Sequence, residues 1–406
     1  MKIIQGGVTA AKGYRAIGLY AGIKKKRKDM ALVFSEVPAK VAGTFTTNVV
    51  KAAPVKWDIK IINENEFVQA VVLNSGVANA CTGAEGDENN LKMAEAVAAS
   101  FHLSTCAVLT ASTGVIGKQL PMDVVTEGVK LLASALEDSI EGGLFAAEAI
   151  MTTDTYSKES AVSFEVGGKV VTIGGMAKGS GMIHPNMATM LGVVTTDIAI
   201  SKDLLQKATS ADVKDTFNMI SVDRDTSTND SFIILANGMA GNVEITQENE
   251  DYDKFCKALN IVTTDLAKKM AADGEGATKL FETVVIGAAD KNQAIILSKS
   301  IITSSLVKTA VFGNDANWGR ILCAMGYAGV NFDPDQVDLY IESIQGKLQL
   351  VKNGMATDYS EEVATKILSE KEVRAIADIK MGDATATAWG CDLTYDYVKI
   401  NADYRS

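Results

Sequence analysis

The sequence predicts an α/β protein, because apolar strand-like segments alternate with helical segments along most of its length. Its 406 residues allow two or three domains or one large layered domain. Hydrophobic residues make up 47% of the chain and charged residues 22%, which is typical of a globular protein. With 34 glycines and only 5 prolines, we expect many tight turns and no long extended linker.

In the first half of the chain, two apolar runs predict buried strands at 67–73 and 107–110. Each run leads into a small, polar, glycine-containing stretch, 74–83 and 111–118, which we interpret as a loop at a strand end. Between these strands, residues 91–101 have helical periodicity and are good helix formers, so we expect a helix there.

Residues 159–173 alternate between apolar and polar side chains around a Gly-Gly pair, which predicts a β-hairpin. A glycine-rich stretch follows over 174–191, and we interpret its start as a loop in which glycine allows close backbone approach. The next strand is expected at 191–199. Thr189 would then stand at the beginning of a strand and be fixed by the sheet.

The second half of the chain continues this alternation. We expect helices at 203–218 and 252–271, polar loops at 221–230 and 273–278, an apolar strand at 232–235, mixed segments over 279–330, and a strand-rich end over 336–406. No low-complexity segment or convincing repeat interrupts the pattern.

The chain is acidic, with 39 basic against 50 acidic residues and a net charge of −11. Such a charge repels nucleic acid and anionic membranes, so we expect neither as a partner. The basic run at 24–28 is a local exception. A nucleic-acid patch is one interpretation of it, but the strand-like segments on both sides favour a solvated hairpin turn that protects a strand edge.

The 5 cysteines are dispersed and form no C-x-x-C pair, which favours free buried thiols in a reducing compartment. The N-terminus lacks an uninterrupted apolar core, so we expect no signal peptide. No apolar run reaches the length that spans a membrane. We therefore expect a cytoplasmic protein.

Two common nucleotide-binding motifs are incomplete. Residues 179–184 begin with the first two glycines of a dinucleotide fingerprint, but His184 occupies the place of the third. Gly117–Lys118 resembles the end of a P-loop, but Gln119 occupies the place of Ser or Thr. We expect no bound nucleotide cofactor.

The acidic and histidine residues also argue against a metal site. Residues 223–227 begin like a calcium loop, but Thr228 replaces its glycine and Ile234 replaces its bidentate glutamate. The chain has only 2 histidines, His102 and His184, which excludes a histidine-rich zinc site. We expect no metal.

The scarcity of histidine leaves an enzyme in need of another base, and an α-amino group with a pKa of about 7.7–8.0 is suitable. A threonine hydroxyl becomes a good nucleophile when its own α-amino group lies beside it, which requires cleavage just before it. We therefore hypothesise that the Ala188–Thr189 bond breaks by self-processing. An inert Ala-Thr pair in a loop is the alternative. His184 precedes a proline and is expected to shape the loop.

The segment Ser112–Gly114 follows an expected strand. Its hydroxyls and backbone N–H groups could stabilise a developing oxyanion. A plain polar turn is the alternative, and these residues taken alone favour the turn.

The order of motifs along the chain resembles the glutamate N-acetyltransferase (ornithine acetyltransferase) family of arginine biosynthesis. The central run, 174–191, carries the resemblance most clearly. The other matching motifs are Asn74–Gly83, Ser112–Gly117, Met151–Thr155, Asp225–Asp230, Gly274–Thr278, Gly313–Arg320 and Asn401–Arg405. They cover essentially the whole chain in the family's order.

The resemblance implies a self-cleaving precursor that yields an α chain, 1–188, and a β chain, 189–406, assembled as a two-α, two-β heterotetramer. It also implies a layered α/β sandwich that is similar in outline to amino-terminal-nucleophile hydrolases but differs in connectivity. The implied reaction moves acetyl from N2-acetyl-L-ornithine to L-glutamate through an acetyl-threonine. Some members also accept acetyl-CoA as a co-substrate, and no other cofactor is implied.

The resemblance also assigns site residues. Thr189 matches the nucleophile, and Thr113 and Gly114 match the oxyanion residues. The matches to substrate contacts are Thr152, Lys178, Thr189, Glu275, Asn401 and Ser406. Family members usually end in Thr where this chain has Ser406, and the retained hydroxyl is expected to keep that contact with looser packing.

Lys178 could bind a substrate carboxylate, and Glu275 an α-amino group or its proton. Without the resemblance, both would be interpreted as surface charges. Two other functions remain open: a self-cleaving amidase or aminopeptidase that transfers the acyl group to water, and an uncleaved small-molecule-binding protein that has lost catalysis.

Overall fold

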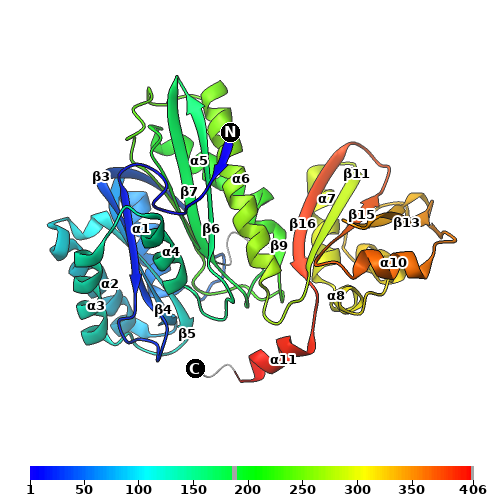
Figure 1. Ribbon diagram of the computed structural model, residues 1–406, viewed down its shortest axis with the longest axis horizontal. Helices are drawn as coiled ribbons and strands as arrows, with labels where there is room; N and C mark the ends of the chain where they lie inside the picture. Colours follow the sequence, from blue (N-terminus) through cyan, green and yellow to red (C-terminus); the bar gives the residue numbers. More distant parts are fainter. Residues whose placement is uncertain (185–189, 404–406) are drawn as a thin grey trace.

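The computed structural model describes residues 1–184 and 190–403 and contains two β-sheets with helices on and between them (Figure 1). The strands are β1 (Lys2–Ile4), β2 (Tyr14–Leu19), β3 (Met30–Phe45), β4 (Phe67–Val77), β5 (Val108–Val115), β6 (Lys158–Val166), β7 (Lys169–Lys178), β8 (Leu191–Thr196), β9 (Ile220–Ser221), β10 (Ser231–Ala236), β11 (Leu280–Ala288), β12 (Asp338–Ser343), β13 (Gly346–Lys352), β14 (Met355–Ala356), β15 (Glu372–Asp378) and β16 (Ala384–Cys391). The helices are α1 (Ala53–Glu64), α2 (Gly83–Phe101), α3 (Met122–Ala135), α4 (Ile140–Ala149), α5 (Lys202–Asp215), α6 (Glu250–Ala272), α7 (Lys291–Thr303), α8 (Ser305–Phe312), α9 (Trp318–Gly326), α10 (Glu361–Leu368) and α11 (Tyr395–Ala402). The expected layered α/β class is confirmed.

The larger sheet has the strand order β1-β6-β7-β8-β10-β3-β4-β5, and β2 pairs with β3 beside this path. The pairs β8–β10 and β4–β5 are parallel, whereas β7–β8 and β10–β3 are antiparallel. Successive strand residues face opposite sides, so Val33 and Leu73 pack in the core with α4, and Leu32 and Val72 in the core with α2 and α3.

The smaller sheet has the order β14-β13-β12-β15-β11-β16-β9. Helix α6 lies between the two sheets (Figure 1), packing on β6 and β7 on one side and on β16 on the other. Asn249 caps its first turn by accepting the N–H of Tyr252. The side chains Phe255, Leu259 and Val262 recur at helical spacing and are fully buried, so α6 joins the two sheets into one core.

The main expected elements are confirmed. The strands expected at 67–73, 107–110, 191–199 and 232–235 lie in β4, β5, β8 and β10, the helices at 91–101, 203–218 and 252–271 lie in α2, α5 and α6, and the hairpin is β6–β7. The basic run 24–28 connects β2 to β3, which pair antiparallel, so the hairpin turn is also confirmed.

Three expected loops are partly wrong, because strands continue into them. β4 extends to Val77, β5 to Val115 and β7 to Lys178. The polar ends of β4 and β5 pair with each other, and Ser112 donates a hydrogen bond to Asn74 Oδ1 at 2.6 Å. Polar residues can therefore be buried in these strands because they satisfy one another. β8 ends at Thr196, and α2 begins at Gly83, before the expected starting point of its helix.

All five cysteines lie within the described residues and are free, but most are not buried as expected. Cys391 is buried, whereas Cys81 in a bend, Cys106 in a short 3-10 helix and Cys323 in α9 are exposed. Across residues 1–184 and 190–403, no single helix is long and apolar enough to cross a membrane. The bent pair α7–α8 passes on length and composition alone.

Candidate active site

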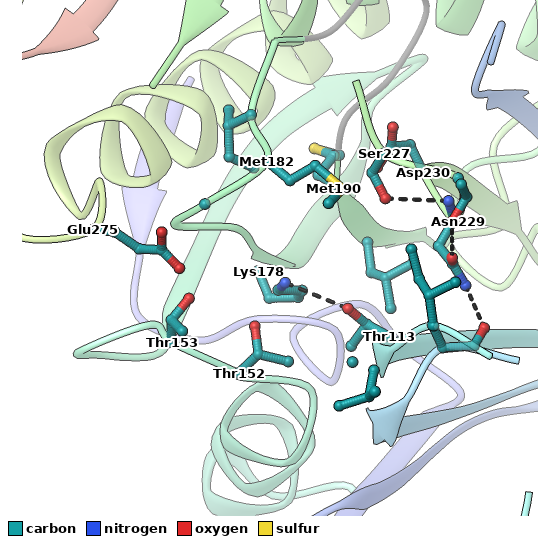
Figure 2. Close-up of a pocket in the computed structure, with 18 of the residues that line it drawn as sticks. Thr113, Thr152, Thr153, Lys178, Met182, Met190, Ser227, Asn229, Asp230 and Glu275 are labelled. Carbon is teal, nitrogen blue, oxygen red and sulfur yellow. Dashed lines mark hydrogen bonds between the residues drawn. The ribbon is translucent and has the colours of Figure 1, made fainter. Parts of the chain in front are cut away.

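A cavity of about 340 Å³ lies where β5, β7 and β8 meet the loops that follow α4, β9 and α6. The residues that the sequence singled out and that the structure brings together on its wall are Thr113, Gly114, Thr152, Lys178, Glu275 and Asn401. Figure 2 labels Thr113, Thr152, Lys178 and Glu275 among them. Ala188, Thr189 and Ser406 lie outside the described residues. Met190, which follows Thr189 directly, also lines the cavity.

Thr113 and Gly114 are held at the end of a paired strand rather than in a free turn. The register of β4 and β5 shifts at Val77, next to these residues. Gly114 has φ +129, and a Cβ at this position would collide with the backbone of Gly76. Only glycine allows this approach, which presents both Thr113 and Gly114 to the cavity. Fixed donors at such a position can stabilise a developing negative charge.

Lys178 ends β7, and 8% of its surface is exposed. Its Nζ donates to Thr113 Oγ1 across 3.5 Å. Burial, together with the charges of Arg27 and Lys178, lowers the pKa of Lys24 to about 8 against the attraction of Asp29 and Asp154. On this side Lys178 supplies a positive charge to the cavity wall.

The sequence analysis expected the basic run 24–28 to be solvated, and this expectation is partly wrong. Lys24 turns inward, and its Nζ donates to Met151 O at 2.6 Å. Arg27 donates to the carbonyl of Thr152. Through these two hydrogen bonds the turn supports the segment that carries Thr152.

Glu275 supplies a negative charge to the same cavity. Only 7% of its surface is exposed, its N–H donates to Ser180 O at 3.0 Å, and its Oε2 accepts the side-chain amide of Asn401 at 2.7 Å. A Cβ on Gly181 would collide with the Glu275 carboxylate, so glycine leaves room for that carboxylate where the loop passes it. Glu275 is therefore not the surface residue that its sequence context alone indicates.

Figure 2 shows Glu275 and Lys178 facing the cavity with Thr152 and Thr153 nearby. A buried carboxylate and a buried ammonium group on one small cavity complement a ligand that carries both charges. An amino acid is such a ligand, since its carboxylate can meet Lys178 and its ammonium group Glu275.

A buried ion network lies behind the cavity. Lys158 is fully buried, and its Nζ contacts Asp154 Oδ1 at 2.7 Å and Asp273 Oδ2 at 2.6 Å. Burial raises the pKa of Asp154, but the charges of Lys178 and Lys158 outweigh burial and hold that pKa well below its usual range. Asp154 also accepts the N–H groups of Thr152 and Gly179. The network therefore fixes both sides of the cavity.

The model of the ArgJ family matches residues 15–406. This chain belongs to the ArgJ family. It is 51% identical to the arginine biosynthesis bifunctional protein ArgJ of Caldanaerobacter subterraneus subsp. tengcongensis, covering 100% of both chains. It is 50% identical to the protein of the same name from Thermotoga neapolitana, over 97% of this chain and 99% of that one. A solved structure of ornithine acetyltransferase complexed with ornithine, from Mycobacterium tuberculosis, is 43% identical and covers 46% of this chain and 99% of its own, with a TM-score of 0.44.

In this ArgJ-family chain, the loop after β7 is held at Gly179 by Asp154 and further along by Asp223. Its carboxylate accepts the N–H groups of Met182 at 2.7 Å and Ile183 at 2.8 Å. His184 Nδ1 lies 3.0 Å from Ser221 Oγ, and burial lowers the pKa of His184 to about 4, with nearby positive charges adding to the effect. At neutral pH this imidazole is an uncharged, weak base.

The sequence reasoning missed the residues that hold this ArgJ-family site in place. Asp154 and Lys158 are four residues apart near the Met151–Thr155 motif, which is the only local signal for their pairing. Asp273 lies 115 positions from Lys158, so no local pattern indicates that contact. Lys24 stands in a run of basic residues, 24–28, and nothing in that run indicates which side chain turns inward.

We predict that Asp154→Asn destabilises this ArgJ-family protein by about 3–5 kcal/mol, because it leaves the buried Lys158 charge incompletely compensated. Urea denaturation at pH 7 measures the difference. Since the folded pKa of Asp154 is lowered, its contribution is present above the ordinary carboxylate pKa and disappears as the pH falls through the lowered value. The gap between wild type and variant should therefore narrow in acid, below about pH 4.

The matched control is Asp87→Asn, which removes a partner from the exposed Lys56–Asp87 pair. Exposed pairs contribute about 0–1 kcal/mol, so this variant should denature almost like the wild type. Equal effects of the two substitutions would contradict the structural role given to Asp154.

Proposed function

We propose that this chain is the acetyltransferase of arginine biosynthesis that moves the acetyl group of N2-acetyl-L-ornithine to L-glutamate. The observation that carries the proposal is the cavity, in which Lys178 and Glu275 supply the charges an amino acid needs beside Thr113 and Gly114. The names of the ArgJ relatives support the pathway. A second activity that acetylates glutamate from acetyl-CoA, used as a co-substrate, fits their description as bifunctional.

Self-cleavage comes first in this mechanism. Thr189 Oγ attacks the carbonyl carbon of Ala188, and its proton passes to the departing Thr189 nitrogen, which leaves an ester. The α-amino group of Thr189 is free at this stage, and water then opens the ester to a carboxylate at Ala188 and the free hydroxyl of Thr189. This freed α-amino group is the proposed base in turnover. The pKa of His184 supports that choice, because an imidazole with a pKa of about 4 is a poor proton acceptor at neutral pH.

In turnover, Thr189 Oγ attacks the acetyl carbonyl of acetylornithine, and the hydroxyl proton passes through the α-amino group to the departing ornithine amine. The amine of glutamate then attacks the acetyl-Thr189 carbonyl and regenerates the hydroxyl. Both steps form an oxyanion, which Thr113 and Gly114 stabilise, and one lost donor costs about 10²–10³ in rate. Thr152, Lys178, Glu275, Asn401 and Ser406 hold the amino-acid portion.

The sheet order supports an α chain, 1–188, and a β chain, 189–406, that stay together after cleavage. β8 and β10, from the second piece, lie between β7 and β3, from the first, and are paired with both. Separating the pieces would break both ladders and expose a buried core. We further propose the two-α, two-β assembly and a cytoplasmic location, which the free cysteines support.

Self-processing is tested on a denaturing gel of purified protein beside Thr189→Ala. The wild type should give two bands of roughly half the full mass each. The variant lacks the attacking hydroxyl and should give one full-length band. A single full-length band from active wild-type protein would sink the cleavage mechanism.

Transfer is distinguished from hydrolysis by the acceptor. We expect ornithine release from acetylornithine to require glutamate, because the acetyl-Thr189 ester must pass its acyl group to an amine. Ornithine is measured with and without glutamate, and with Thr189→Ala as the blank. Equal release in both conditions would favour the amidase or aminopeptidase alternative.

Gly181→Ala tests the proposed role of Glu275 in binding the ammonium group of the substrate. The added methyl group should displace the flexible carboxylate from Asn401 and from the substrate ammonium group, raising KM for the amino-acid substrate about ten- to a hundredfold while changing stability little. Gly326→Ala is the control, since a Cβ there meets no atom within 4 Å. An unchanged KM in Gly181→Ala would remove Glu275 from substrate recognition.

A further inference from the structure

Asn229 is a buried residue on the wall of the same cavity, two positions before β10. Only 5% of its surface is exposed. Its Nδ2 donates to Ala78 O at 2.6 Å and to Ser112 O at 2.8 Å, and its Oδ1 accepts the hydroxyl of Thr228 at 2.6 Å. Both N–H groups of this amide are therefore used by backbone carbonyls, and the amide has no donor left for a ligand.

The two carbonyls belong to the ends of two paired strands. Ala78 directly follows β4, and Ser112 lies in β5 directly before Thr113 and Gly114. The β4–β5 ladder changes register at Val77, and β5 is the last strand in the order of the larger sheet. Strand ends open more readily than strand centres, so a second fastening matters at this point. Figure 2 shows Asn229 with its hydrogen bonds on the side of the cavity that carries Thr113.

The backbone around Asn229 is itself fixed. The carbonyl before it, Thr228 O, accepts the N–H of Ala52, and the carbonyl after it, Asp230 O, accepts the N–H of Thr46, both at 3.0 Å. The chain then enters β10, which lies between β8 and β3. Asn229 therefore fastens the ends of β4 and β5 to the middle of the larger sheet.

We propose that Asn229 is a positioning residue for the oxyanion site: by joining the ends of β4 and β5, it holds Thr113 and Gly114 where a developing negative charge needs them. The inference rests on the proposed acetyl transfer. Donors stabilise an oxyanion because they are fixed before the charge forms, and a displacement of about 1 Å can cost about a hundredfold in rate.

An amide is chemically suited to this position. Ala78 and Ser112 are buried, so each of their carbonyl oxygens needs a donor. The Asn229 amide supplies two donors and carries no charge. A carboxylate of the same shape would repel both carbonyls and also the oxyanion beside them.

The amide joins three of the sequence motifs, 74–83, 112–117 and 225–230. The mechanism above uses only Thr113 and Gly114 from these motifs. The clamp gives the other two motifs a part in the reaction, since one supplies a carbonyl and the other supplies the amide.

The test is the steady-state kinetics of Asn229→Ala, which removes both donors. We expect kcat per folded enzyme to fall about ten- to a hundredfold, because the oxyanion donors are no longer held in place. KM should stay within about threefold of wild type, because Lys178 and Glu275 still bind the amino-acid portion. Ornithine release is measured over a range of acetylornithine concentrations at saturating glutamate. A merely structural role would reduce the yield of folded enzyme and leave its kcat unchanged.

The matched control is Asn242→Ala. Asn242 is 8% exposed, and its Nδ2 also donates to two backbone carbonyls, Ala199 O at 3.0 Å and Val243 O at 2.8 Å. It is not among the described residues that line the cavity. This variant loses the same two donors and should keep the wild-type kcat. An unchanged kcat in Asn229→Ala, or an equal fall in Asn242→Ala, overturns the inference.

Thr228→Val covers an Asn229→Ala chain that does not fold. Valine keeps the shape of threonine but removes the hydroxyl that orients the Asn229 amide. The expected result is a smaller fall in kcat, about three- to tenfold, with KM again within about threefold. A wild-type kcat in this variant contradicts the inference.

Amide hydrogen exchange tests the clamp without turnover. Residues 111–117 should exchange about tenfold faster in Asn229→Ala than in wild type, because the end of β5 opens more readily. Asn242→Ala should leave their exchange unchanged. Equal protection of this segment in Asn229→Ala and wild type overturns the inference. A wild type that transfers no acetyl group, with faster exchange in Asn229→Ala, contradicts the proposed function alone.

Discussion

The cavity depends on one buried ion network, in which the ammonium group of Lys158 lies between Asp154 and Asp273. A fully buried lysine is stable only when paired, so the segments that carry the two carboxylates must both approach it. Asp154 then fixes Gly179 at the start of the loop after β7, and the carbonyl of Asp273 accepts the hydroxyl of Ser180. Three segments that are distant in sequence are thereby set in one arrangement around the cavity.

The second constraint is the interleaving of the larger sheet. Lys178 ends β7 directly opposite Leu191 in β8. The β7–β8 ladder therefore joins the piece before the proposed cut to the piece after it. Residues before the cut supply Lys178, Thr113 and Gly114, and residues after it supply Glu275 and Asn401. The cavity is complete only when both pieces are present. Breaking one peptide bond at this position therefore releases a chain end without dismantling the site.

Local patterns in the sequence predicted where most strands and helices lie, because apolar runs such as those in β4, β8 and β10 are buried on both faces. They failed where burial comes from tertiary pairing. Gly174 to Lys178 continue β7 because they pair with β6 and β8, pairings that no local pattern shows. Lys178 and Glu275 were assigned through the family resemblance, because an isolated charge does not show whether it faces solvent or a cavity.

The shortage of histidine is the reason for proposing that one residue, Thr189, supplies both the nucleophile and the base. His184 is bonded to Ser221 and is a weak base, while Lys178 and Glu275 are assigned to the two ends of the substrate. In the proposed mechanism the α-amino group of Thr189 is the base, and the ordinary pKa of such a group, about 7.7–8.0, suits neutral pH. A Ser-His-Asp triad must orient side chains from three positions. In the proposed mechanism the hydroxyl and the amine are carried by one Cα, so one residue has to be positioned in place of three.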